Sequence, residues 1–309
     1  MKKIAIIGAG ISGLYLANLL EKEKDLDYKI FEKRSKLNLE EGYGIQLSVN
    51  SIKLLNKIDF KNITASDIFF PTKVSFFKSN NPNKICDIDL TQFNDDLNRY
   101  TTTKRSTLLK FLLKNIPKDK IKFNTNLKHL DYSDAIKAKF SDEIEENFDF
   151  LIIADGVFSQ SKLIILKEGL KPKYNNSIAL RGKLNKYDDN NISIFMGSNF
   201  HYVIYPVNQN NEYNFVAILH KKLTVSELNN EQILQSEDFI NSLKKTITNN
   251  SLTNLENLTE IHVFPVFVSK SLTTINQKNI FLSGDALFAF PPSFAQGASQ
   301  SIETAQDIF

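Results

Sequence analysis

Two continuous apolar runs, one near each end of the chain, stop at a glycine. Residues 4–7 lead directly into Gly8, and residues 280–282 lead through Ser283 into Gly284. A short apolar run bounded by turn residues is typical of a fully buried strand, as in a parallel sheet. A helix start follows each glycine. The pattern therefore predicts two strand–glycine–helix junctions at opposite ends of the chain.

The hydrophobic periodicity also predicts the elements between these junctions. Helical spacing predicts helices over residues 11–24, 50–58, 105–113 and 231–248. Alternation and short apolar runs predict strands over 3–7, 28–32, 73–78, 84–90, 123–130, 136–140, 148–154, 192–196, 202–207, 213–219, 260–268 and 280–283. The first strand, helix and strand form a βαβ unit of the size expected for a dinucleotide-binding half.

The order of the elements predicts an α/β fold with two interleaved units. A chain of 309 residues is long enough for one large α/β domain or two interlocked ones. We predict a Rossmann-like domain that is interrupted twice by a strand-rich α+β domain. The Rossmann-like domain comprises residues 1–71, 99–172 and 270–309. The inserted domain, which we expect to bind the substrate, comprises residues 72–98 and 173–269.

Composition narrows the class of protein. Hydrophobic residues make up 42% of the chain and charged residues 24%, which is typical of a soluble globular protein. The net charge of +3 is small and no dense basic block occurs, which argues against a nucleic-acid partner. The single cysteine, Cys86, excludes an intramolecular disulfide and favours a reducing, cytoplasmic location. Because its neighbours alternate in polarity, we expect Cys86 to be a buried strand thiol.

The uncharged stretch over residues 4–20 must be distinguished from a signal peptide or a membrane span. Its glycines, Asn18 and a length just short of the ~20 apolar residues of a span favour a buried strand and a buried helix. No other segment of the sequence approaches membrane length. The histidines share no ligand spacing, so we expect no metal site. They are His129, His201, His220 and His262.

The first junction carries a G-x-G-x-x-G motif formed by Gly8, Gly10 and Gly13. In this motif the first glycine permits the tight turn, and the second lets the backbone approach a pyrophosphate. The third glycine lets helix and strand pack closely. The helix start at Ile11 and Ser12 then presents free N–H groups and a positive dipole end to the phosphates.

An acidic residue at the end of the second predicted strand narrows the choice of dinucleotide. Glu32 lies 19 residues beyond Gly13. A carboxylate at this place accepts hydrogen bonds from ribose hydroxyls and disfavours a 2′-phosphate. The junction therefore predicts FAD or NAD rather than NADP.

Further motifs choose between these cofactors. Asp155-Gly156 follows one predicted strand, and Gly284-Asp285 follows another and is succeeded by Pro292 and a small-residue helix start at Ala295. Together with Gly42-x-Gly44-Ile45, they resemble the motifs of the para-hydroxybenzoate hydroxylase-like and salicylate hydroxylase-like FAD-dependent aromatic monooxygenases. The resemblance spans nearly the whole chain. It implies a FAD-binding domain of the glutathione-reductase-like type.

The resemblance implies which residues contact FAD. Asp285 would accept hydrogen bonds from the ribityl hydroxyls, although Asp is also a favoured helix cap. The N–H groups of Gln296-Gly297-Ala298 would face the flavin pyrimidine edge, where the helix dipole stabilises negative charge on the reduced ring. Arg105 would reach the pyrophosphate or the ribityl chain, although an isolated Arg at a helix start is commonly a surface residue. The other implied contacts are Lys33, Arg34, Gly44, Ile45, Leu127, Asp155, Gly284 and Pro292.

Some positions depart from the family pattern. Lys162 stands where the family usually has an Arg. The lysine keeps the charge but lacks the bidentate geometry of an arginine, and this difference concerns the contacts with the nicotinamide coenzyme. Phe288 replaces the usual His after the GD motif. Ala295 and Ser299 replace Gly and Asn at the helix start, where a small residue still admits the flavin.

The resemblance also implies the activity of a single-component monooxygenase. NADH or NADPH would reduce the flavin, O₂ would add to it, and the hydroperoxide would transfer one oxygen atom to an aromatic or similarly electron-rich substrate. The substrate would lie between the flavin and the sheet of the inserted domain. No catalytic side chain is assigned. The expected lining residues are Arg181, Val203, Tyr205, Phe290, Pro291 and Pro292.

Several alternatives stay open. Val203 and Tyr205 share a strand face, but core packing would explain them equally well. Arg181 would hold a substrate carboxylate or form an ion pair with a neighbouring strand. Two alternatives to a monooxygenase are also open. One is an FAD oxidoreductase without oxygen insertion. The other is a C-terminally truncated, non-catalytic FAD-binding remnant, which is considered because the chain ends at Phe309 within its last predicted helix. The choice of NADH or NADPH, and of monomer or homodimer, is also open.

Overall fold

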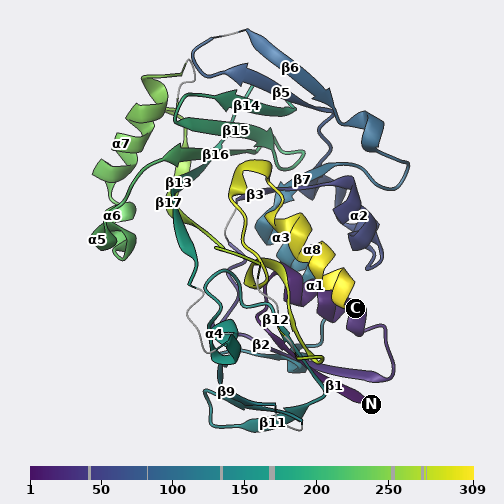
Figure 1. The fold of residues 1–309 in the computed structure, drawn as a ribbon. Helices are drawn as coiled ribbons and strands as arrows, with labels where there is room; N and C mark the ends of the chain where they lie inside the picture. Colours follow the sequence, from purple (N-terminus) through teal and green to yellow (C-terminus); the bar gives the residue numbers. More distant parts are fainter. Residues whose placement is uncertain are drawn as a thin grey trace.

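The strand at the start of the chain occupies the centre of a parallel sheet with five strands (Figure 1). The computed structural model describes residues 1–40, 43–81, 83–132, 135–166, 171–251, 255–272, 275 and 277–309. Gly42, which belongs to one predicted motif, lies outside the described residues. The sheet order is β18-β12-β1-β2-β8, with the bounds Ile280–Leu282, Phe150–Ile153, Lys2–Ile7, Leu26–Phe31 and Ile121–Lys122.

The carboxyl ends of these strands meet at one edge of the sheet. Ile7 pairs with Ile153 on one side and with Phe31 on the other, and Ile153 also pairs with Leu282. The loops that follow the strands therefore begin side by side. In open parallel sheets this edge is where ligands bind.

Helices cover one face of the five-stranded sheet. Ile6 of β1 shares a core with Leu14, Leu108 and Ile302 from three helices. In Figure 1 the last helix lies beside the first, although they come from opposite ends of the chain. The helices are α1 (Ile11–Leu20), α2 (Val49–Asn56), α3 (Arg105–Leu113) and α8 (Gly297–Ile308).

Three antiparallel strands and a short helix lie on the opposite face. The Phe31 ring of β2 stacks on Phe140 with 3.9 Å between ring centroids and meets Phe148 edge-on at 5.9 Å. These rings belong to a core that also includes Ala5 and Ile7 of β1. The elements are β9 (Leu127–Asp131), β10 (Ile136–Phe140), β11 (Glu145–Phe148) and α4 (Gln160–Leu166).

A second large sheet, with seven strands, occupies the upper half of Figure 1. Its neighbouring strands are antiparallel except for the parallel pair β14 and β5. The order is β17-β13-β16-β15-β14-β5-β6, with the bounds Thr259–Val268, Lys173–Leu184, Tyr213–His220, Phe200–Pro206, Ile192–Met196, Lys73–Lys78 and Lys84–Asp89.

One face of the seven-stranded sheet is covered by a helix, and the other faces a small sheet. Leu243 and Ile247 of α7 share a core with Phe215 of β16. On the other side, the Thr102 hydroxyl donates to the Pro206 carbonyl at 2.6 Å. The small sheet has the order β3-β7-β4, with the bounds Gly44–Leu47, Thr101–Lys104 and Ile68–Phe69. The helices before β17 are α5 (Val225–Leu228), α6 (Glu231–Leu234) and α7 (Glu237–Thr248).

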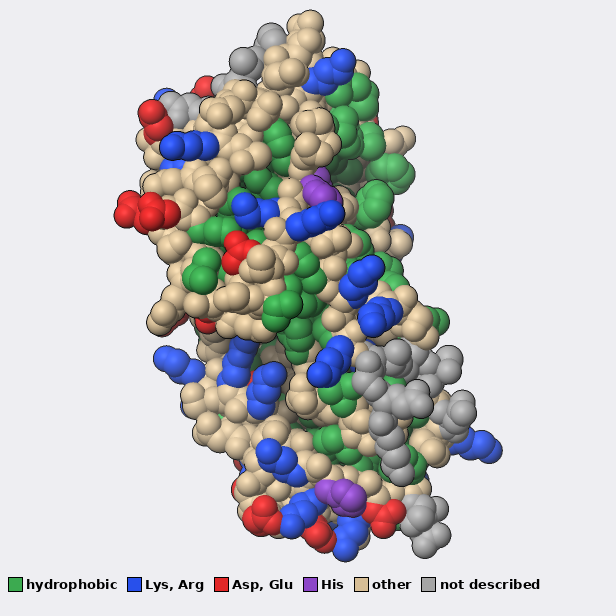
Figure 2. Space-filling model, turned by 60° about the vertical axis from the view of Figure 1, so that its left-hand side comes forward, with side chains coloured by type: hydrophobic (Ala, Val, Ile, Leu, Met, Phe, Trp, Pro, Cys, Tyr) green, Lys and Arg blue, Asp and Glu red, His purple; other side chains and the backbone are tan. Residues whose placement is uncertain are grey.

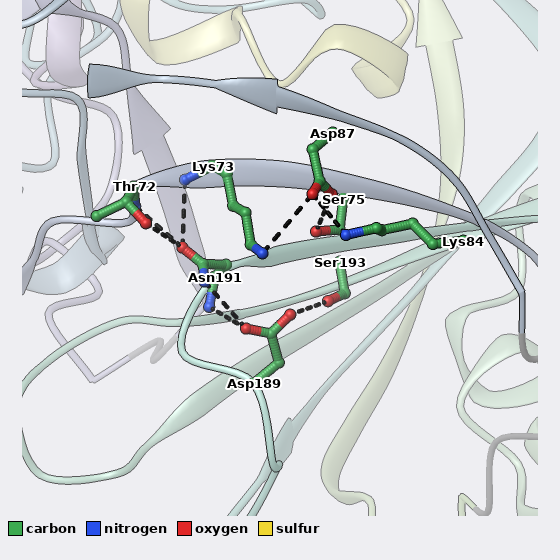
Figure 3. A network of polar contacts seen from close by, with 8 residues as sticks. All are labelled: Thr72, Lys73, Ser75, Lys84, Asp87, Asp189, Asn191 and Ser193. Carbon is green, nitrogen blue, oxygen red and sulfur yellow. Dashed lines mark hydrogen bonds and ion pairs between the residues drawn. The ribbon is translucent and has the colours of Figure 1, made fainter. Parts of the chain in front are cut away.

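A polar network joins the outer strands of the seven-stranded sheet (Figure 3). Asp87 of β6 accepts a hydrogen bond from the Ser75 hydroxyl at 2.7 Å and pairs with Lys73 and Lys84. Hydrogen bonds from Lys84 and Ser75 hold the pKa of Asp87 below its usual range. Asn191, just before β14, accepts hydrogen bonds from the segment that leads into β5. The network therefore fastens β6, which is the edge strand, to β5.

The expectation that Cys86 is buried is wrong, because the thiol is exposed. Every residue of β6 is exposed, and β6 pairs with β5 alone at the edge of its sheet. The core beneath α7 is built from other strands of this sheet. An alternating pattern identifies a strand, but it does not say whether another layer covers that strand.

The predicted elements are largely confirmed. The helix over 105–113 and the strands over 73–78 and 192–196 have the predicted bounds. The uncharged run over 4–20 is a strand followed by a helix whose residues are buried except Ile11. That helix ends at Leu20 rather than at residue 24.

Two predicted elements are each divided in the structure. The helix predicted over 231–248 is α6 followed by α7, because the Ser236 side chain accepts a hydrogen bond from the N–H of Phe239 and begins a new helix. The strand predicted over 148–154 contains the end of β11 and all of β12. In both cases the apolar periodicity continues across the break.

The surface is mixed in character. On the face shown in Figure 2, Lys and Arg side chains are interspersed with apolar patches and acidic residues. Within the described ranges, no helix has both the length and the apolar character needed to cross a membrane.

Candidate cofactor and substrate site

The two strand–glycine–helix junctions predicted from the sequence meet in the structure. The hydroxyl of Ser12, in the first turn of α1, lies 2.5 Å from the hydroxyl of Ser283, which follows β18. Thr304 of α8 contacts the Ser283 hydroxyl at 3.2 Å and accepts a hydrogen bond from the N–H of Gly284 at 2.9 Å. Elements from both ends of the chain therefore form one continuous site at the carboxyl edge of the sheet.

The three N-terminal glycines have the geometry that their spacing predicts. Gly8 has a φ of +108°, and a Cβ at Gly13 would lie 2.1 Å from the carbonyl oxygen of Gly8. A Cβ at Gly10 would have no neighbour within 4 Å, so this glycine faces open space. Gly10 is also the N-cap residue of α1, and no described side chain caps that helix. The N–H groups of its first turn therefore remain available to a ligand as far as the described side chains are concerned.

Glu32 fastens the glycine turn to the end of β2. Its Oε2 accepts a hydrogen bond from the N–H of Ala9, and its Oε1 accepts one from the N–H of Arg34, both at 2.9 Å. Only 8% of Glu32 is exposed. Each carboxylate oxygen keeps a second lone pair, so a ribose hydroxyl can still donate to it. Lys33 and Arg34 are exposed beside it.

The structure brings Asp285 and Arg105 together, as expected for the two ends of one ligand site. Asp285 lies in the 3₁₀ turn Gly284–Ala286, and Gly284 has a φ of +59°. Asp285 is exposed as a residue, but desolvation by the surrounding protein raises the pKa of its carboxyl. The Arg105 guanidinium lowers the same pKa by a smaller amount. A carboxyl and a cation from distant segments are thus close enough for the cation to lower the pKa of the carboxyl.

The start of α8 resembles the start of α1. Gln296 is the N-cap residue, and no side chain of the described residues caps the helix. A Cβ at Gly297 would meet nothing within 4 Å. Ala295 has a φ of +53°, which explains why the family favours Gly at this position. Pro292 begins the 3₁₀ turn just before it.

The DG motif contains a carboxylate that is only partly satisfied. The Oδ2 of Asp155 accepts a hydrogen bond from the N–H of Ser161 at 3.2 Å. Its Oδ1 is buried and has no hydrogen-bond partner among the described residues. Lys162 lies in α4, the helix that follows this loop. Its side chain is directed inward, and its Nζ donates to the carbonyl of Ala286 at 3.0 Å. Sequence reasoning identified Lys162 as a departure but missed this contact.

These residues fit FAD as the bound group. A buried acceptor at Asp155, two helix starts without side-chain caps, and two glycines that face open space are what a long phosphate-bearing cofactor with hydroxyl groups requires. The individual contacts with FAD stay predictions. Among the residues predicted to make them, Leu127 has its side chain buried in the core behind the sheet.

The face of the seven-stranded sheet that meets β3 carries the predicted substrate residues. Arg181 of β13 pairs with Val216 of β16, which pairs in turn with Val203 of β15, so the three side chains share this face. Tyr205, two residues after Val203, lies on it as well. A Cβ at Gly44 would be 2.8 Å from the Tyr205 ring, which places β3 against this face.

Arg181 contacts an aromatic ring and has no acidic partner among the described residues. Its guanidinium lies 5.4 Å from the centroid of the Tyr43 ring. Within the described part of the chain, it has no hydrogen-bond or carboxylate partner, so the predicted alternative of an ion pair with a neighbouring strand finds no support. Tyr205 is deeply buried, and burial raises its pKa even though Arg181 lowers it. Phe290 and Pro291 are exposed in the loop after Asp285.

A surface cavity lies apart from this site, and the described residues offer no metal centre. A cavity of about 810 Å³ on the outer side of α3 is lined by residues such as Thr107 and Lys114, and none of the predicted contact residues lines it. Among the residues that the structure describes, no group of three or more His, Cys, Asp or Glu side chains could hold a metal ion.

The fold and the site define a flavin-binding protein of the α/β class. The chain belongs to the FAD binding domain family, whose model matches residues 1–309. It is 24% identical over 225 residues to 3-amino-4-hydroxybenzoate 2-monooxygenase from Streptomyces cremeus, covering 70% of this chain and 56% of that protein. It is 23% identical over 244 residues to salicylate hydroxylase from Pseudomonas putida, covering 70% and 54%.

A solved structure supports the same fold. The 2,6-dihydroxypyridine-3-hydroxylase from Arthrobacter nicotinovorans matches with a TM-score of 0.81 at 16% identity, covering 99% of this chain and 82% of that chain. The chain spans about half or less of the length of the curated relatives that it matches. The predicted α/β fold, FAD as the cofactor, and the resemblance to FAD-dependent aromatic monooxygenases are confirmed.

Proposed function

We propose that the protein is an FAD-dependent monooxygenase that uses NADH or NADPH and O₂ to hydroxylate a small aromatic substrate, in particular an aromatic acid. One observation carries the proposal. The two junctions that would hold FAD meet at one edge of the five-stranded sheet, and α8 contacts β3, which packs on the sheet face that carries Arg181. This cation has no anionic partner among the described residues. The relatives named as monooxygenases of an aminohydroxybenzoate and of salicylate support it, because both names denote aromatic carboxylates.

In this proposal the protein binds and orients, and the cofactor supplies the redox chemistry. When bound, FAD supplies electron transfer and the activation of oxygen. Backbone N–H groups at the starts of α1 and α8 bind the cofactor, and Asp285 accepts hydrogen bonds from its hydroxyls. Arg181 holds the substrate carboxylate, while the neighbouring Val203 and Val216 present a wall of low polarity to the aromatic ring.

The proposal also divides the chain. Residues 1–71, 99–172 and 270–309 form the FAD-binding domain, and residues 72–98 and 173–269 form the substrate domain. The division is supported by the sheets, because the five-stranded sheet falls wholly within the first set of ranges and the seven-stranded sheet wholly within the second. We further propose a cytoplasmic protein that acts as a monomer or homodimer, with the single cysteine supporting a reducing location.

The test is oxygen insertion. Protein reconstituted with FAD is mixed with NADH or NADPH and a panel of phenols and aromatic acids under ¹⁸O₂, and coenzyme oxidation and product mass are followed together. We expect at least one aromatic acid to stimulate oxidation and to gain one ¹⁸O atom. Stimulated oxidation that yields hydrogen peroxide or a dehydrogenated product, without ¹⁸O in the organic product, would favour an oxidoreductase without oxygen insertion.

A further inference from the structure

A buried lysine joins the two acidic motifs of the cofactor site. Lys162 lies in the first turns of α4 and is 5% exposed. Its Nζ donates to the carbonyl of Ala286 at 3.0 Å, and Ala286 is the last residue of the turn that carries Asp285. The ammonium group therefore reaches from the loop after β12 to the loop after β18.

The start of α4 is held by two polar side chains of the loop before it, which contact backbone N–H groups and not the Lys162 ammonium group. The Ser159 hydroxyl accepts a hydrogen bond from the N–H of Lys162 at 3.0 Å, which caps the helix. The Asp155 carboxylate accepts one from the N–H of Ser161. Asp155 also raises the pKa of Lys162, while burial lowers it by more. The charge on Lys162 is thus balanced by a carboxylate at longer range and by the Ala286 carbonyl.

We propose that Lys162 is a positioning residue for FAD, which holds the Gly284–Ala286 turn so that Asp285 can accept hydrogen bonds from the cofactor. The inference rests on the proposed function as far as FAD binding and not as far as oxygen insertion. It differs from the role that the sequence suggested for this position, which was contact with the nicotinamide coenzyme. Lys162 is 5% exposed as a residue and its Nζ is bonded to the Ala286 carbonyl, so the side chain is not directed at a coenzyme that docks from solvent.

The physical reason is the carbonyl of Ala286. Within the described ranges, Lys162 is its hydrogen-bond donor, and the carbonyl belongs to a turn of only three residues. A buried carbonyl that loses its donor is costly to keep in place, so the turn would shift to regain a partner. Any such shift moves Asp285, which is the neighbouring residue.

The experiment compares FAD binding by three variants. Apoprotein is titrated with FAD, flavin fluorescence gives the Kd, and the KM for NADH and NADPH is measured separately on FAD-saturated protein. We expect Lys162→Met to raise the FAD Kd about tenfold, as for loss of a hydrogen bond from a charged donor, with both KM values unchanged. Lys162→Arg keeps a charged donor and should restore most of the affinity.

A matched control separates positioning from general stability. Ser159→Ala removes the cap of α4 but leaves the ammonium group in place, so it should lower the Tm of the apoprotein and leave the FAD Kd within about twofold of wild type. Equal losses of FAD affinity in Ser159→Ala and Lys162→Met would overturn the proposal. So would a Lys162→Met variant with wild-type FAD affinity and a raised coenzyme KM. Wild-type protein that binds no FAD overturns the proposed function and this inference together, whereas FAD binding without oxygen insertion contradicts the proposed function alone.

Discussion

At the edge of the five-stranded sheet the candidate site depends mainly on backbone, with glycines and with helix starts that no described side chain caps. On the face of the seven-stranded sheet it is made of side chains, chiefly Arg181 and Val203. The two regions therefore respond differently to substitution. A Cβ added at Gly8 or Gly13 would collide with main chain, and no rotamer can relieve that collision. A changed side chain on the second alters what is bound and leaves the sheet intact.

The largest expected effect is at Gly13, on the backbone side. A Cβ there would lie 2.1 Å from the carbonyl oxygen of Gly8, a main-chain atom in the turn between β1 and α1. We expect Gly13→Ala to lower the free energy of unfolding by about 3 kcal/mol, at the upper end for overpacking. Urea unfolding of the apoprotein measures this loss. A variant as stable as wild type would mean that α1 and β1 are not packed this closely.

Gly10→Ala is the matched substitution that should spare the fold. Its Cβ meets nothing within 4 Å, and its φ of −81° is open to alanine. We expect an unfolding free energy close to wild type and an FAD Kd raised tenfold or more, because the methyl group keeps phosphate oxygens from N–H groups at the start of α1. FAD titration of the apoprotein tests this. Wild-type affinity would contradict the placement of the pyrophosphate beside Gly10.

The contrast between the two regions also explains what could be predicted from the sequence. The backbone side depends on local rules, because a glycine motif after a buried strand specifies its own turn, helix and ligand. Gly8, Gly13 and Glu32 accordingly have the geometry that their spacing predicts. The strands of the other region could be recognised singly, but their order depends on pairing between distant segments. Arg181, for example, lies between His262 and Val216.

The misses have the same origin. Cys86 alternates with its neighbours as a buried strand residue would, yet nothing local says that its strand forms an edge. The Tyr43 ring beside Arg181 comes from a segment far away in the sequence, and no periodicity indicates that contact. Lys162 could be recognised as a departure, but its inward direction depends on how α4 packs. A binding site can be predicted from the sequence where the backbone of a local motif makes the contact.

In the side-chain region, Arg181→Met should weaken the binding of acidic substrates and leave the stability of the fold nearly unchanged. Loss of a charged donor is expected to raise the KM for an aromatic acid about tenfold, while the KM for an uncharged phenol stays near its wild-type value. Arg181→Lys should give a smaller rise, since it keeps the charge but not the planar fork. The Tm should be nearly unchanged, because the guanidinium has no anionic partner among the described residues. Equal increases in KM for acids and phenols would argue against a carboxylate site.

Asp285 predicts a smaller effect that depends on pH. Burial raises the pKa of this carboxyl more than Arg105 lowers it, so in the free protein it keeps its proton to higher pH than an ordinary Asp. The unfolded chain loses that proton first, and the stability of the apoprotein should therefore fall as pH rises through this interval. FAD hydroxyls donate to the ionised form, so FAD affinity should rise with pH, by no more than tenfold per unit. Asp285→Asn should bind FAD more weakly, with an affinity that does not change with pH. If its affinity changed with pH as steeply as that of wild type, the titrating proton would belong to another group.

The smallest effect is expected at Ala295, where the backbone side departs from the family. Ala295 lies in the left-handed region, where an L-residue costs about 1–2 kcal/mol. A glycine would remove this strain, but the greater freedom of the unfolded chain would offset about 0.5–1 kcal/mol of the gain. Ala295→Gly should therefore raise the free energy of unfolding by at most about 1 kcal/mol, whereas the β-branched Ala295→Val should lower it. Thermal unfolding of both variants measures the pair. If the glycine variant were the less stable of the two, residue 295 would not hold this conformation in solution, and the start of α8 would lack the backbone geometry that the flavin site needs.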